Sequence, residues 1–231
     1  MVNRSDFCQP ITSFDWNQLD FNTIASASLD SSVTIWNIEQ QEITTQLVAH
    51  EKAVYDISFS LEETVFATVS EDASLRLFDT RELRNSNIVY EMENKQGLTH
   101  VKWNLQNRNL MAVVAQDDNN VLLFDKRRPN QIVDTLNRRS KVNAISWSPA
   151  ASNLICSVHE DGNALIWDLN DSGQPIVDEQ TGAENQERSM EPREPKSEYT
   201  TGQKIFNVVW SQADPTWVSV SFDERLQTLR T

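Results

Sequence analysis

Short apolar runs separated by polar turns recur along the whole chain. Four of these runs are four residues long and rich in β-branched, leucine or aromatic side chains: Val33–Trp36, Leu75–Phe78, Val121–Phe124 and Ala164–Trp167. Such residues favour strands, and runs this short are typical of strands packed between stacked sheets. The pattern therefore predicts an all-β fold.

Each run belongs to a unit that is repeated five times, in residues 13–37, 56–79, 101–125, 144–168 and 207–230. An aromatic residue closes the first strand of each unit: Trp16, Phe59, Trp103, Trp147 and Trp210. An aspartate follows in a tight turn: Asp30, Asp72, Asp118, Asp161 and Asp223. A large apolar residue lies six positions after each aspartate: Trp36, Phe78, Phe124, Trp167 and Leu229. This constant step indicates a structural repeat.

The turn aspartates and the strand spacing predict four-stranded blades. An aspartate can accept hydrogen bonds from backbone N–H groups two or three residues on, and so sets a hairpin turn. Room for one more strand per unit is found at Glu42–Ala49, Asn87–Met92, Gln131–Leu136 and Ser197–Thr201. The large apolar residues of the first four units lie 42, 46 and 43 residues apart, which fits the WD-repeat period. We therefore expect a WD-repeat β-propeller with about five blades present.

The expected organisation is an N-terminal segment, residues 1–10, followed by blades over 11–231. The blades are assigned to residues 11–50, 51–92, 93–137, 138–201 and 202–231, the last of them incomplete. Residues 171–198 are rich in Pro, Gly, Glu and Gln and are expected to be a disordered acidic insertion. It could be a partner-specific tether or a tolerated surface loop. Five units do not obviously close a ring, so further blades are expected upstream.

Charge and cysteine content narrow the class of partner. The chain has 34 acidic and 20 basic residues and a formal net charge of −14, which disfavours direct binding to nucleic acid or anionic membranes. The two cysteines, Cys8 and Cys156, have no metal or redox spacing and are expected to be reduced thiols. With no run of 18 apolar residues and no apolar run at the start, a soluble intracellular protein is expected.

Catalytic and cofactor motifs are not found in the sequence. There is no Gly-x-Ser-x-Gly elbow, phosphate-binding glycine loop, HExxH motif or Cys/His cluster, and only five glycines occur. We therefore expect neither an enzyme nor a bound metal or cofactor. His50 lies 22 residues before Asp72, where WD units place a histidine that hydrogen-bonds the turn aspartate. His100 and His159 are expected to be structural or exposed.

Several stretches resemble a particular family of WD-repeat scaffolds. They are residues 3–17 (NRSDFCQPITSFDWN), 45–59 (TQLVAHEKAVYDISF), 164–168 (ALIWD) and 215–219 (PTWVS). This family includes the Transparent Testa Glabra and anthocyanin-eleven proteins and the cullin-ligase-associated adaptor of dual-specificity tyrosine-regulated kinases. The resemblance implies a seven-bladed propeller without enzymatic activity, complexes with protein kinases or with Myb and basic helix-loop-helix regulators, and a location in cytoplasm and nucleus.

Two groups of residues are candidate protein-binding positions. Arg81 in Phe-Asp-Thr-Arg and Arg127 in Phe-Asp-Lys-Arg resemble the Trp-Asp-x-Arg boxes with which WD-repeat receptors contact the adaptor of cullin ligases. An arginine fork can pair with a carboxylate at two points, although each arginine could instead pair with an aspartate of a neighbouring blade.

The second group lies in the loops that precede inner strands. Arg138, Arg139 and Lys141 form a basic island, and Tyr55 occupies the corresponding region of an earlier unit. The basic island could instead be a simply solvated turn. The sequence thus leaves two functions open: a scaffold for kinases or transcriptional regulators, and a substrate receptor of a cullin-based ubiquitin ligase. A propeller enzyme is a third class for which no residues can be named.

Overall fold

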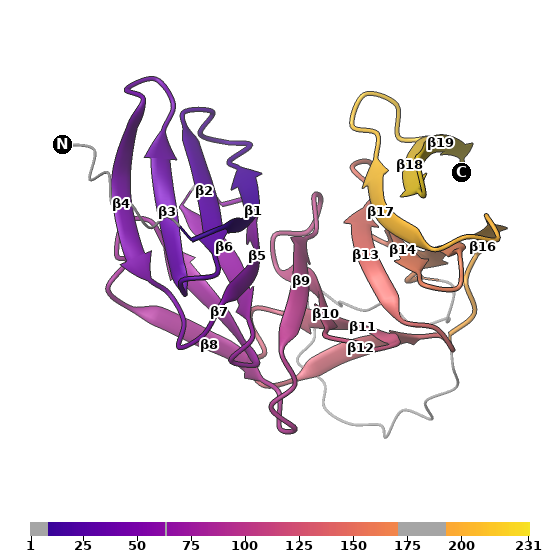
Figure 1. The fold of residues 1–231 in the computed structure, drawn as a ribbon, viewed down its shortest axis with the longest axis horizontal. Helices are drawn as coiled ribbons and strands as arrows, with labels where there is room; N and C mark the ends of the chain where they lie inside the picture. The colour runs from indigo at the N-terminus through magenta and orange to yellow at the C-terminus, as the bar shows by residue number, and fades with distance from the viewer. Residues whose placement is uncertain (1–8, 63, 171–192) are drawn as a thin grey trace. The chain divides into compact units, whose positions relative to one another are not determined.

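The computed structural model describes residues 9–62, 64–170 and 193–231. Every regular element in these ranges is a β-strand, and the strands form antiparallel sheets (Figure 1). The predicted all-β class and the four-stranded blade are confirmed. We number the sheets as blades in chain order.

The strands of the blades are as follows. Blade 1 has the order β1 (Ile11–Trp16), β2 (Thr23–Ser28), β3 (Ser32–Asn37) and β4 (Glu42–Val48). Blade 2 has the order β5 (Val54–Phe59), β6 (Val65–Ser70), β7 (Ser74–Asp79) and β8 (Ser86–Glu91). Blade 3 contains β9 (Leu98–Trp103), β10 (Leu110–Ala115), β11 (Asn120–Asp125) and β12 (Ile132–Asn137). Blade 4 contains β13 (Val142–Trp147), β14 (Leu154–His159), β15 (Asn163–Asp168) and β16 (Ser197–Thr200). Blade 5 contains β17 (Ile205–Trp210), β18 (Trp217–Phe222) and β19 (Arg225–Arg230).

The chain divides into two compact units, which we describe separately. The first unit consists of Met1–Asp117 and Leu123–Ile132, and the second of Asp118–Leu122 and Val133–Thr231. The first unit contains the interfaces between blades 1 and 2 and between blades 2 and 3. The second contains the interface between blades 4 and 5.

Part of the expected disordered insertion is ordered. Residues 171–192 lie outside the described residues, whereas residues 193–198 are described and β16 begins at Ser197. The Arg193 guanidinium donates to the Asp134 carboxylate at 2.7 Å and to the Asp168 carbonyl at 3.0 Å. These two bonds fix the chain just before β16, so the prediction of disorder through residue 198 is wrong for its last six residues.

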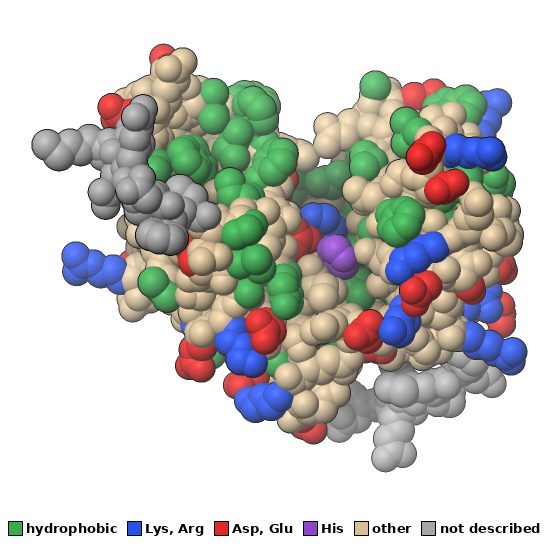
Figure 2. All heavy atoms as spheres, viewed as in Figure 1, with side chains coloured by type: hydrophobic (Ala, Val, Ile, Leu, Met, Phe, Trp, Pro, Cys, Tyr) green, Lys and Arg blue, Asp and Glu red, His purple; other side chains and the backbone are tan. Residues whose placement is uncertain are grey.

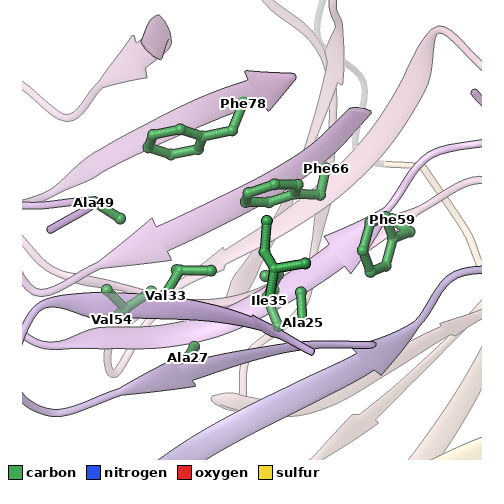
Figure 3. Close-up of a cluster of buried hydrophobic side chains, with 10 residues drawn as sticks. Ala25, Ala27, Val33, Ile35, Ala49, Val54, Phe59, Phe66 and Phe78 are labelled. Atoms are coloured by element: carbon green, nitrogen blue, oxygen red, sulfur yellow. The ribbon is translucent and has the colours of Figure 1, made fainter. Parts of the chain in front are cut away.

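Adjacent blades pack a large-residue face against a small-residue face. At the interface of blades 1 and 2, blade 1 contributes small or β-branched residues from β2 and β3, such as Ala25, Ala27 and Val33. Blade 2 contributes Phe66 and Phe78, whose rings stack with centroids 5.3 Å apart (Figure 3). We call the large-residue side of a blade, which faces the preceding blade, its leading face, and the other side its trailing face.

A register shift recurs at one position of every first strand. In each blade one residue, four positions before the closing aromatic, is skipped in the pairing of the first two strands: Thr12, Tyr55, Thr99, Asn143 and Phe206. Such a bulge re-aims the extra side chain away from the regular alternation. It therefore frees one side chain per blade for contacts outside its own sheet.

Candidate protein-interaction sites

Side chains of three first strands, β1, β5 and β13, bind the backbone of the first strand in the next blade. The Phe59 N–H donates to the Asp15 carboxylate at 2.7 Å, and the Trp103 N–H donates to the Ser58 hydroxyl at 3.0 Å. In the second unit the Trp210 N–H donates to the Ser146 hydroxyl at 3.1 Å. The acceptor in all three cases is the residue immediately before the closing aromatic of the preceding blade. Sequence reasoning missed this contact, although the repeat alignment places a short polar residue at all three positions.

Asp56 is a second joint between blades in the first unit. Its buried carboxylate accepts from the Ser13 hydroxyl of blade 1 at 2.5 Å and from the Val101 N–H of blade 3 at 3.0 Å. The Lys102 ammonium lies 3.0 Å away. Burial by itself would raise the pKa of Asp56, but the charge of Lys102 and hydrogen bonds from His100 and Ser13 outweigh it and lower the pKa to about 2.

The turn aspartates mostly bind backbone as the repeat predicts. The carboxylates of Asp30, Asp72 and Asp161 accept from N–H groups two residues on at 2.9, 2.9 and 3.1 Å, and Asp118 does so at 3.3 Å. Asp223 differs, because it adopts the left-handed φ of 50° itself. In the turns of Asp30, Asp72 and Asp161 the next residue has a positive φ. In the third turn Asp117, the residue before Asp118, has the positive φ, of 57°.

The two tryptophans of the repeat donate their indole N–H to a serine ten residues earlier. Trp36 binds the Ser26 hydroxyl at 2.9 Å and Trp167 binds the Ser157 hydroxyl at 2.8 Å. Phe78 and Phe124, which have no such donor, are buried by packing alone at 3% and 0% exposure. These four positions hold the blade interiors together.

His50 links a turn aspartate to the blade interior. Its Nδ1 lies 3.0 Å from Asp72 Oδ2 and 3.1 Å from the Ser74 hydroxyl, and its Nε2 lies 2.7 Å from the Thr68 hydroxyl. Burial lowers the pKa of His50 despite the neighbouring Asp72. The ring is therefore a structural bridge.

His159 makes a comparable bridge in blade 4 from a different position in the sequence. It is buried, its Nε2 lies 2.9 Å from the Ser157 hydroxyl, and its Nδ1 lies 3.0 Å from the Ser140 carbonyl. Through Ser157 it reaches the indole of Trp167. The fixed spacing that singled out His50 could not identify His159, because this histidine comes from within β14.

Arg81 and Arg127 occupy equivalent positions after β7 and β11, and both fold back onto their own motif. The Arg81 guanidinium makes a two-point contact with the Asp79 carboxylate, the shortest distance being 2.6 Å. Arg127 makes the same contact with Asp125, also at 2.6 Å. The alternative prediction was that each arginine pairs with an aspartate of a neighbouring blade. In the structure each arginine pairs instead with the aspartate two residues before it in the same blade. Hydrogen bonds from Arg81 lower the pKa of Asp79 to about 2.

These arginines belong to one cationic rim of the first unit. Lys126, between Asp125 and Arg127, pairs with Glu62, which lies in the loop between β5 and β6 of blade 2. The negative charge of Glu62 also favours the charged form of the Arg81 guanidinium. We call Arg81, Lys126 and Arg127 the basic rim. Their side chains are 74%, 19% and 46% exposed, so the two arginines are the accessible members.

Tyr55 is the bulge residue of β5 and is half-buried. The equivalent bulge residues Thr12 and Asn143 reach the next blade, where they donate to the carbonyls of Val54 at 2.6 Å and Ile205 at 2.6 Å. The position is thus used for blade joining elsewhere in the chain. Tyr55 as a binding residue stays a prediction.

The predicted basic island of the second unit is only partly available. Arg138 lies over the Trp167 ring, 6.0 Å from its centroid, and within 3.6 Å of Glu198. Arg139 and Lys141 are exposed. Arg138 therefore supports blade 4, while its two neighbours are the accessible cations of this loop.

Within the described ranges, no group of three or more His, Cys, Asp or Glu side chains is placed to hold a metal ion. None of the described residues forms a helix long and apolar enough to cross a membrane. Burial raises the pKa of the Cys156 thiol to about 12, so this thiol is unreactive at neutral pH.

Comparisons with known proteins agree with the repeat. Residues 41–79, which run from β4 to the end of β7, match the family described as "WD domain, G-beta repeat". The chain is a WD-repeat protein. Residues 68–182 also match the family described as "Eukaryotic translation initiation factor eIF2A".

Three similar proteins show how far the likeness extends. The WD-repeat chain is 39% identical over 227 residues to the "DDB1- and CUL4-associated factor 7 homolog" of Dictyostelium discoideum, covering 98% of this chain and 65% of that protein. It is 34% identical to WD repeat-containing proteins of Saccharomyces cerevisiae and Schizosaccharomyces pombe. Each match covers 72% of this chain, and 36% and 42% of those proteins. The chain thus spans less than two thirds of the length of each relative.

We predict that Asp56 makes the free energy of unfolding of the first unit fall as the pH is lowered. A carboxylate whose pKa is lowered by folding stabilises the protein above its unfolded pKa of 3.8, and this contribution is lost as the pH falls through about 2. Asp56→Asn should therefore be destabilising at pH 5, and the difference in unfolding free energy from the wild type should shrink by roughly 2 kcal/mol by pH 2. Urea unfolding at several pH values measures it. A difference that stays constant over this range contradicts the assignment.

Proposed function

We propose that this WD-repeat chain is a non-catalytic scaffold that holds protein partners on the exposed rims and loops of its blades. The observation that supports it is that some polar side chains join strands and blades, whereas others are exposed at strand ends. Asp15, Asp56 and His50 join strands and blades, whereas the cations at strand ends remain accessible. A rigid frame with accessible groups at its rim is suited to positioning partners.

The proposed partners are protein kinases or transcriptional regulators, in the cytoplasm and nucleus. The support is the resemblance of residues 3–17 and 45–59 to WD-repeat scaffolds that bind such proteins. Holding two partners on one frame raises the effective concentration of each near the other. Scaffolding of this kind needs no reacting group in the chain itself.

We predict that two partners bind at once. The purified full chain should form a stable ternary complex with a dual-specificity tyrosine-regulated kinase and DDB1, with a mass equal to the sum of the three by light scattering. Simultaneous binding is expected because a scaffold offers separate surfaces. Displacement of the kinase by DDB1, or failure of the kinase to bind, would contradict the scaffold function.

A second candidate function is attachment to a cullin-based ubiquitin ligase as an adaptor or substrate receptor. The basic rim favours it, because Arg81 and Arg127 present the same side chain at the same strand end of neighbouring blades. Each guanidinium is held by its own aspartate in a fixed orientation, which reduces the entropy lost when it binds a partner. The Dictyostelium relative is named as a factor associated with DDB1 and CUL4.

We predict that the basic rim is needed for binding to DDB1. The double variant Arg81→Ala with Arg127→Ala should weaken the dissociation constant for purified DDB1 by tenfold or more, since charged hot-spot side chains typically cost 1 kcal/mol or more each. The matched control is Arg84→Ala with Arg128→Ala, which removes two exposed arginines from the same loops. The two double variants therefore have the same net charge.

The control variant should bind DDB1 like the wild type, and neither double variant should change kinase binding. Equal weakening by both double variants would mean a general charge effect, and no weakening by either would remove the rim from the interface. Both results contradict the role of the basic rim, whereas a wild type that does not bind DDB1 contradicts the ligase function. Kinase binding by the wild type is measured separately and tests the scaffold function.

A further inference from the structure

The basic rim contains an ion pair between neighbouring blades. Lys126 lies in the loop between β11 and β12 of blade 3, and its partner Glu62 lies in the loop between β5 and β6 of blade 2. Both residues belong to the first unit. Lys126 is the residue directly before Arg127, so Glu62 holds the rim of blade 3 next to one of its two accessible arginines.

This ion pair is less exposed than a typical surface pair. Acidic and basic side chains lie next to one another at several places on the face that Figure 2 draws. Exposed pairs, such as Lys52 with Glu71 at 56% and 45% exposure, are screened by water and contribute little. Glu62 and Lys126 are only 34% and 19% exposed. Their attraction is therefore better able to hold two loops together.

The backbone of Glu62 is fixed by a tight turn. Its N–H donates to the Ser60 hydroxyl at 2.8 Å, and its carbonyl accepts from the Val65 N–H at 3.2 Å. The carboxylate thus extends toward Lys126 from an ordered backbone. It also favours the charged form of Arg81, so one carboxylate acts on the rim of both blades.

The loop between β11 and β12 contacts blade 2 at a second point. The Asn130 N–H of this loop donates to the carbonyl of Val89 in β8 at 2.7 Å. Arg127 lies between the two attachment points, Lys126 and Asn130. The loop that carries this arginine is therefore fastened to the blade that carries Arg81.

The corresponding place between blades 1 and 2 has no such ion pair. Asp20 holds the turn position of Glu62, and Thr80 holds the motif position of Lys126. Threonine has no charge, and the Asp20 carboxylate accepts instead from the Thr23 hydroxyl at 2.5 Å. The ion pair thus occurs between the two blades that carry the rim arginines.

We propose that Glu62 is a positioning residue of the basic rim. It holds the β11–β12 loop on blade 2 and so fixes Arg127 relative to Arg81 for binding two acidic groups of a partner. Guanidinium groups held at one spacing lose less entropy when they pair with carboxylates at the matching spacing. This proposal rests on the cullin-ligase function and names a residue on which that function depends.

A double-mutant cycle on the purified full chain tests the proposal with DDB1 as the probe. Glu62→Gln and Lys126→Gln should each raise the dissociation constant about threefold, the scale of a half-exposed ion pair. The variant with both changes should bind no more weakly than either, because the same interaction is lost once. If Glu62 acted only through its charge, Glu62→Gln would instead bind DDB1 more tightly.

A second measurement follows the loop itself. The Asn130 amide should exchange its hydrogen about threefold faster or more in Glu62→Gln, because one of the two attachments of the loop is gone. The matched control is Glu82→Gln, which removes the same charge from an exposed residue directly after Arg81. Glu82 binds the Asn85 side chain, so this control should neither weaken DDB1 binding nor change exchange at Asn130.

Three outcomes overturn the proposal. In the first, Glu62→Gln binds DDB1 as tightly as the wild type or more tightly. In the second, it binds more weakly while exchange at Asn130 is unchanged, since Glu62 would then contact the partner itself. In the third, the wild type does not bind DDB1, and the ligase function fails together with the proposal. Failure of the proposal alone is recognised because the wild type still binds.

Discussion

The structure depends on the hydrogen bond that three of the closing aromatic residues, Phe59, Trp103 and Trp210, donate from their backbone N–H to a side chain of the preceding blade. The first strand of every blade is a sheet edge, and an edge presents unpaired N–H groups. Asp15, Ser58 and Ser146 satisfy these groups without merging neighbouring sheets into one. An acceptor with one or two carbons between backbone and oxygen spans the gap between blades. This requirement explains why a short polar residue interrupts an otherwise apolar interface.

Other buried polar side chains bind one another inside the blades. His50 and His159 both bridge a blade interior, although they come from different parts of the repeat. The serines at 26 and 157 accompany tryptophan, and Thr68, at the same spacing from Phe78, binds His50 instead. These groups satisfy one another inside the blades, whereas Arg81 and Arg127 lie exposed at strand ends.

Much of the fold could be predicted from the sequence, because the six-residue step from the turn aspartate is enforced by hairpin geometry. The bulge at Tyr55 and its equivalents could not, because the extra residue has no fixed chemical character. The two-point contacts of Arg81 and Arg127 with their own aspartates were also missed. They depend on the backbone turning after the strand, which residue spacing does not reveal. Order at residues 193–198 results from the Arg193 contacts, which composition cannot show.

Hydrogen exchange of single backbone amides tests most directly whether side chains of one blade bind the next. In the variant Ser58→Ala, the Trp103 amide should exchange at least tenfold faster than in the wild type, because its acceptor is gone. The Phe59 amide, whose acceptor Asp15 is unchanged, should keep its rate. Equal rates at Trp103 in both proteins, or a uniform acceleration at both amides, would contradict the account.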